Sequence, residues 1–105
     1  MKSVKLSLAL ATSLIALSST AFADEGADLY VSKTCNACHG ADAKTPIQPM
    51  YPKLAGQNAE YLLQQMKDIK SGDRANGQTA LMKGIIANVS EEEMGKIAEY
   101  IAGLE

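Results

Sequence analysis

Two segments of the chain carry apolar residues at helical spacing, and the first covers residues 58–71. Its apolar stripe consists of Leu62, Met66 and Ile69. Asn58 is a favourable N-cap residue, and Gly72 is typical of the residue that ends a helix. The pattern predicts an amphipathic helix over residues 58–71, with its apolar side facing a core.

The second segment, residues 90–104, has the same periodicity and a clearer start. Its apolar positions are Met94, Ile97, Ala98, Ile101 and Leu104. Ser90 can cap the first turn, and Glu93 three residues later completes a capping box. We therefore predict a C-terminal helix. Met94, like Met66, is expected to pack in the core, where a flexible thioether fills gaps well.

The remaining segments have shorter or broken patterns. Residues 24–33 predict a first short helix, and residues 80–89 predict a loop that enters a short apolar helix. Residues 40–57 contain all three prolines of the chain, which excludes a long helix and predicts a loop. The side chains expected to turn inward from this loop are Met50, Tyr51 and Leu54. The chain shows helical patterns and no strand pattern around its cysteines, so we expect an all-α fold.

Residues 1–23 have the pattern of a secretory signal peptide. A basic start is followed by an apolar run over residues 6–17 and by a small-x-small cleavage site that ends at Ala23. The apolar run is short for a membrane span, although a retained membrane anchor is the alternative. We predict cleavage after Ala23, which leaves residues 24–105 as one exported domain.

Charge and composition limit the functions of this domain. Two of the ten basic residues lie in the signal, so eight basic residues face twelve acidic ones in the rest of the chain. An acidic domain of this kind is not expected to bind nucleic acid, and no basic amphipathic helix indicates membrane binding. The chain has no Trp, and its one Phe, Phe22, lies in the signal. A large flat cofactor would supply the bulk that this thin core lacks.

The candidate chemistry lies in Cys35-Asn36-Ala37-Cys38-His39-Gly40, which has the Cys-x-x-Cys-His pattern of c-type haem attachment. Two thiols at this spacing can form thioethers with the two vinyl groups along one haem edge. The adjacent imidazole then lies under the iron. Export favours this interpretation, because bacterial c-type cytochromes mature outside the inner membrane.

Three other interpretations compete with haem. A thioredoxin-type redox pair is expected beside a βαβ pattern, which is missing around the motif. A structural zinc site needs four ligands, which are usually Cys and His side chains. The chain has only Cys35, Cys38 and His39 of these types, so carboxylates would have to complete the site. A plain disulfide is possible in an oxidising compartment but leaves the histidine without a role.

A haem iron in an electron carrier normally has a second protein ligand, and His39 is the only histidine. A methionine thioether is the usual partner, and it raises the reduction potential. Met50 is close to His39 in the sequence, so the chain would have to turn around the haem edge at once. Met82 follows a polar loop and is far enough along to reach the opposite face. We predict Met82 as the distal ligand, with Met50 as its rival.

The chain resembles the class I c-type cytochromes, specifically the small bacterial periplasmic mono-haem type. The resemblance covers the whole predicted mature chain. It rests on a Tyr-bearing helix before the haem motif, the run PMYPKLAGQ at residues 49–57, Tyr61-Leu62, Ala80-Leu81-Met82 and an aromatic-bearing C-terminal helix. It implies four to five short helices wrapped around one covalently bound haem c. One departure is Leu81, where relatives often have proline.

The resemblance also assigns roles to particular residues. It implies that Cys35 and Cys38 hold the haem, with His39 as proximal and Met82 as distal iron ligand. Pro49 resembles the proline whose backbone carbonyl accepts the proton of the outer His39 nitrogen. Gly26 and Tyr30 resemble the contact with the last helix near Tyr100.

The predicted function is therefore a soluble periplasmic electron carrier, a monomer without catalytic residues or enzymatic activity. By resemblance, its transient partners are a membrane quinol–cytochrome c oxidoreductase and a terminal oxidase or reductase. A haem-based sensor with an open sixth coordination site is the main alternative. A haem-free thiol–disulfide protein and a subunit of a larger enzyme also stay open.

Overall fold

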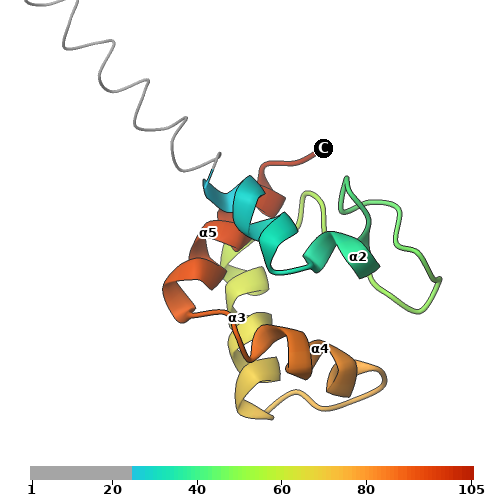
Figure 1. Ribbon diagram of the computed structural model, residues 1–105, viewed down its shortest axis with the longest axis vertical. Helices are drawn as coiled ribbons and strands as arrows, with labels where there is room; N and C mark the ends of the chain where they lie inside the picture. Colours follow the sequence, from blue (N-terminus) through green and yellow to red (C-terminus); the bar gives the residue numbers. More distant parts are fainter. Residues whose placement is uncertain (1–24) are drawn as a thin grey trace, which may run out of the picture.

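The computed structural model describes residues 25–105; the predicted signal peptide, residues 1–23, and Asp24 lie outside them. Within the described part of the chain all regular structure is helical, which confirms the all-α prediction (Figure 1). A first helix covers 25–32. The others are α2 (Cys35–His39), α3 (Ala59–Ser71), α4 (Thr79–Ile86) and α5 (Glu91–Ala102). None of the helices in residues 25–105 is long and apolar enough to cross a bilayer.

The core forms where α3 packs against both α4 and α5. Both helical stripes expected from the sequence are buried there, and Met66 and Met94 lie within them. The exception is Leu104, which is only half-buried and follows the end of α5. The buried apolar side chains of these three helices are Leu62, Met66, Ile69, Ile86, Met94, Ile97, Ala98 and Ile101. Gly72 ends α3 in the left-handed conformation, with φ 94°, as its position in the sequence predicted.

The capping box of α5 is present with both of its hydrogen bonds. The Glu93 amide donates to Ser90 Oγ at 3.1 Å, and the Ser90 amide donates to Glu93 Oε1 at 2.9 Å. The bond from the Ser90 amide is the main reason that the pKa of the Glu93 carboxyl lies below its usual value. Two otherwise unpaired amides of the first turn are thereby satisfied, which confirms the predicted helix start.

Replacing Ser90 with Ala should lower the free energy of unfolding by about 1 kcal/mol, because the Glu93 amide loses its acceptor. In a domain of this size that loss corresponds to a thermal midpoint roughly 4–8 °C lower. Thermal unfolding followed by circular dichroism measures it. Ser32→Ala is the control, since Ser32 is exposed and makes only a 3.5 Å contact to Leu29 O. Equal midpoints for the two variants would contradict the role of Ser90.

Two details of the helix starts differ from the prediction. Asn58 occupies the N-cap position of α3, but its side chain makes no capping bond. Its own amide instead donates to Gln57 Oε1 at 3.0 Å. Residues 80–89 do not begin as a loop, because α4 starts at Thr79. The Thr79 amide and hydroxyl both donate to Asn76 O, and this turn starts the helix early.

The loop over residues 40–57 also departs from the prediction in part. Leu54 packs against the core and Tyr51 is half-buried, as expected of inward-facing residues. Met50 is instead 59% exposed. It lies in a turn closed by the Tyr51 amide and Gln48 O at 3.1 Å, and this turn carries its side chain outward.

The first helix meets α5 at a close contact. A Cβ on Gly26 would lie 2.5 Å from Lys96 O and 2.6 Å from Tyr100 Cβ. One turn later, the rings of Tyr30 and Tyr100 pack with centroids 5.7 Å apart. Lys96 Nζ also pairs with Glu25 Oε2 at 2.7 Å. The contact that the family resemblance implied for Gly26 and Tyr30 is therefore confirmed.

Gly26→Ala should destabilise the protein by about 1–3 kcal/mol, because the added methyl group has no room beside the α5 backbone. Chemical denaturation gives the free energy of unfolding. Gly95→Ala is a matched control within α5, where a Cβ meets nothing within 4 Å. That control should gain about 0.5–1 kcal/mol from its better helix propensity. A Gly26 variant as stable as the Gly95 variant would contradict the close packing of the two helices.

Candidate haem site

The short helix α2 carries the Cys-x-x-Cys-His motif between two tight turns. Thr34 before it has φ 63° and Gly40 after it has φ 89°, so the chain bends sharply at both ends. Cys35, Cys38 and His39 stand at positions i, i+3 and i+4 of one helical turn, which places them on one face. Both thiols are free, as thioether formation requires.

The imidazole of His39 is held by a backbone carbonyl. His39 is 7% exposed, and its Nδ1 lies 2.9 Å from Pro52 O. A carbonyl oxygen can only accept, so Nδ1 carries the proton and donates it to Pro52 O. The other ring nitrogen, Nε2, then keeps its lone pair and can bind a metal. The hydrogen bond also fixes the ring and makes Nε2 a better donor.

This geometry corrects one assignment made from the sequence, because the carbonyl belongs to Pro52 and not to Pro49. The reason is the turn from Gln48 to Tyr51, in which Pro49 occupies the second position that proline favours. Pro49 is exposed in that turn. Pro52, three residues further on, follows the turn as the chain comes back toward the motif.

Backbone hydrogen bonds attach the loop to the motif and so place Pro52. The Ile47 amide donates to Cys38 O at 3.0 Å. Further along, the amides of Leu54 and Ala55 both donate to Ala43 O, at 2.8 and 3.1 Å. Pro52 therefore lies between two anchored points, and its carbonyl is held toward the imidazole.

Asp42 organises the turn that presents Ala43. Its Oδ1 accepts from the amides of Lys44 and Thr45, both at 2.9 Å, and these two bonds lower the pKa of its carboxyl. Sequence reasoning did not single out Asp42. The spacing Asp42-x-x-Thr45 was an available signal, because aspartate commonly bonds backbone amides two and three residues on in a turn.

Tyr30 makes a second contact that the sequence did not predict. Its hydroxyl donates to Gly40 O at 2.6 Å, which ties the first helix to the end of α2. Burial is the main cause that raises the pKa of Tyr30 to about 12. Burial also raises the pKa of the Cys35 thiol to about 11, so this thiol is neutral at physiological pH.

The four methionines in the described chain occupy different environments. Met66 and Met94 are buried in the core, at 8% and 1% exposure. Met82 is half-buried on α4, where it packs against the core, and its neighbour Leu81 is 59% exposed. The structure thus brings Cys35, Cys38, His39 and Pro52 together, whereas Met82 lies on an element that does not pack against α2.

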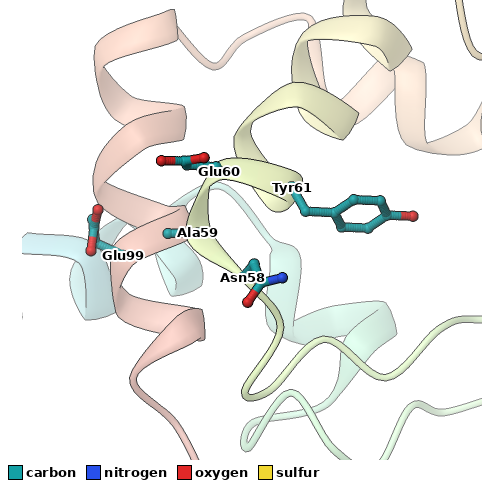
Figure 2. A pocket seen from close by; sticks show the side chains of 5 residues that line it. All are labelled: Asn58, Ala59, Glu60, Tyr61 and Glu99. Atoms are coloured by element: carbon teal, nitrogen blue, oxygen red, sulfur yellow. The ribbon is translucent and has the colours of Figure 1, made fainter.

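An open hollow of about 530 Å³ lies between the start of α3 and Glu99 of α5 (Figure 2). Its lining residues are Asn58, Ala59, Glu60, Tyr61 and Glu99. The Tyr61 ring points away from Glu99 in Figure 2. None of the residues that the sequence assigned to haem lines this hollow, so it is separate from the candidate site.

The donor set fits a c-type haem better than the alternatives. Two free thiols on one helical turn match the vinyl groups of one haem edge, and a buried imidazole with an available Nε2 follows directly. Within residues 25–105, no three His, Cys, Asp or Glu side chains come together in a way that could hold a metal ion.

Short helices around a Cys-x-x-Cys-His turn, with a carbonyl-bound histidine, define the class of c-type cytochromes. The chain belongs to the cytochrome c family, whose family model matches residues 23–105. This confirms the resemblance to class I c-type cytochromes. Covalently attached haem c is the cofactor of the family, and electron transport is its function.

Individual relatives agree with this result. Cytochrome c4 of Pseudomonas aeruginosa is 43% identical over 103 residues, which cover 97% of this chain and 48% of that protein. Cytochrome c-554(548) of Halomonas halodenitrificans is 40% identical over 72 residues, 69% of this chain and 86% of the relative. Reduced cytochrome c4 from Pseudomonas stutzeri has a similar structure, with a TM-score of 0.72 and 31% identity over 82% of this chain and 50% of that one. The chain spans about half the length of the cytochrome c4 relatives.

Proposed function

We propose that this c-type cytochrome carries single electrons in the periplasm through one haem with His39 and Met82 as axial ligands. The observation that carries the proposal is the hydrogen bond from His39 Nδ1 to Pro52 O at 2.9 Å. It leaves a fixed, electron-rich Nε2 on the same helical turn as two free thiols. When bound, the haem supplies an iron that alternates between ferrous and ferric states.

Each residue of the site has a separate task in this proposal. Cys35 and Cys38 form the two thioethers and hold the haem to α2. His39 binds the iron on the proximal side. Pro52 keeps the His39 ring in place and strengthens its donor nitrogen, which stabilises the ferric state relative to a ring without this bond.

Met82 is proposed as the distal ligand because the positions of the other three methionines suit this role less well. Met66 and Met94 are buried in the core between α3 and α5. Met50 is exposed, in a turn of the loop that carries the His39 acceptor. Met82 lies on α4 and is only half-buried at the margin of the core, so its thioether is the one that remains for the distal position. Two bound axial ligands leave no open position for a substrate, as an electron carrier requires.

The proposal includes export to the periplasm. Residues 1–23 act as a signal peptide, and residues 24–105 form the cytochrome domain. The boundary is supported by the family model, which starts to match at residue 23. Covalent haem attachment in bacteria also takes place outside the inner membrane.

The proposed partners are redox proteins that dock briefly. A membrane quinol–cytochrome c oxidoreductase would donate electrons, and a terminal oxidase or reductase would accept them. One relative, from Stutzerimonas stutzeri, is named a thiosulfate dehydrogenase electron acceptor and is 37% identical over 111 residues. An enzyme that oxidises sulfur compounds is therefore a second candidate donor.

One set of measurements on periplasm-expressed protein tests the proposal. The intact mass should equal that of residues 24–105 plus one haem. The reduced-minus-oxidised spectrum should be that of a six-coordinate c-type haem, and the reduced protein should bind carbon monoxide poorly. Rapid carbon monoxide binding by the wild type would instead favour the sensor alternative. A mass without the haem increment would refute the haem assignment altogether.

A further inference from the structure

Two lysines bind the backbone of the short turn between α4 and α5, residues 87–89. Lys33 Nζ donates to Asn88 O at 3.0 Å. Lys70 Nζ, from the last turn of α3, donates to Val89 O at 2.7 Å. The Lys33 ammonium also pairs with Glu93 Oε2 at 3.5 Å. Carbonyls after a helix C-terminus carry partial negative charge, so cations are favourable there.

The turn is rigidly joined to α4. The Ala87 amide donates to Lys83 O at 3.0 Å, and the Val89 amide donates to Ile86 O at 3.0 Å. Ile86 and Val89 are both fully buried, at 0% exposure. Because α4 is a single short helix from Thr79 to Ile86, fixing its C-terminal end also fixes the position of Met82.

The position of α4 relative to the haem motif also depends on the packing of this helix in the core. In the described chain α4 packs against α3, whereas α2 and α4 make no direct contact and lie apart in Figure 1. Lys33 stands two residues before Cys35 and reaches a carbonyl 55 residues further along the chain. Its side chain thus links the segment that carries the thiols to the end of the helix that carries Met82.

We propose that Lys33 and Lys70 are positioning residues that hold α4 so that the Met82 thioether stays on the iron. This inference rests on the proposed distal ligation by Met82. Without the two ammonium groups, the turn loses charge-assisted hydrogen bonds to two carbonyls, and α4 moves away from the haem more often. The fraction of molecules with an open sixth position then rises.

The test measures how readily an added ligand displaces Met82 in the ferric holoprotein. The apparent affinity for imidazole increases in proportion to the open fraction. Losing one hydrogen bond from a charged donor should raise this affinity about tenfold in Lys33→Leu. The sulfur-to-iron charge-transfer band should weaken in the same variant. Leucine is used because it introduces no donor and no sulfur.

Matched variants separate positioning from general stability. Lys67→Leu removes the same charge and a 3.0 Å ion pair to Glu91 of α5, but it leaves residues 87–89 untouched. Its imidazole affinity should stay within about twofold of wild type, whatever happens to its thermal midpoint. Lys33→Arg keeps a charged donor and should restore an affinity close to wild type.

The outcomes distinguish this inference from the ligand assignment on which it depends. Met82→Ala should lose the charge-transfer band and bind imidazole most tightly. If that variant keeps the band, the assignment of Met82 is wrong. If it loses the band while Lys33→Leu and Lys70→Leu bind imidazole no more tightly than Lys67→Leu, the positioning role is overturned. If Lys33→Leu does not fold, the imidazole affinity of Lys70→Leu is compared with that of Lys67→Leu instead, and the same two outcomes apply.

Discussion

Replacing Met82 with Ala should leave the haem attached to the chain and open the sixth coordination position of the iron. The thiols of Cys35 and Cys38 are untouched, so covalent attachment survives. A thioether ligand favours ferrous iron, and its loss should lower the reduction potential. The reduced variant should bind carbon monoxide readily. Redox titration and carbon monoxide difference spectra measure the two effects.

Three conservative replacements serve as controls. Met66→Leu and Met94→Leu should change neither the potential nor carbon monoxide binding, because both residues are buried in the core and the swap conserves volume. Met50→Leu tests the rival ligand. If Met50→Leu opens the iron and Met82→Ala does not, Met50 is the distal ligand and our assignment fails, although electron transport could survive.

Replacing both Cys35 and Cys38 with Ala should abolish covalent haem attachment, while each single replacement should leave one thioether at most. Folding should suffer as well. The only fully buried aromatic side chain in the described chain is Tyr30, so a bound haem would supply apolar bulk that the side chains do not. A small domain with so thin a core depends on its cofactor for stability.

Intact mass spectrometry under denaturing conditions gives the number of chains that keep haem, and the yield of soluble protein reports folding. Cys38→Ser is a useful comparison, since it retains a polar atom of similar size but no thiol. If the double variant still showed the added mass of one haem, attachment through thioethers would be contradicted. A double variant that folds in full yield without haem would show that the core does not need it.

Much of this protein follows from local sequence patterns. The capping box of Ser90 and Glu93 and the stop at Gly72 predicted helix boundaries that the structure confirms. These signals work because a cap involves neighbours three or four residues apart, which any sequence shows directly. The haem motif is equally local. Its two thiols and imidazole lie within five residues, so their shared face needs only one helical turn.

The acceptor of the His39 proton was decided by tertiary structure. Pro49 and Pro52 stand three residues apart in one proline-rich loop, and local preferences do not distinguish their carbonyls. The amides of Leu54 and Ala55 both donate to Ala43 O, and these two hydrogen bonds determine where the loop returns to the motif. They therefore decide which of the two carbonyls lies beside His39. The start of α4, by contrast, depends on a local turn in which the Thr79 amide and hydroxyl donate to Asn76 O, although the apolar pattern alone did not indicate it.

The sequence by itself determined the amphipathic helices α3 and α5 and the cofactor chemistry, because each depends on neighbours along the chain. Only the tertiary structure decided which backbone atoms support those residues. Lys33 illustrates the difference: from the sequence it is one charge beside the haem motif, yet in the fold it binds a carbonyl 55 residues away. Such a contact forms only when folding brings together segments that are far apart in the sequence. Hydrophobic periodicity does not show it, because this pattern indicates only which side of a helix or strand faces the core.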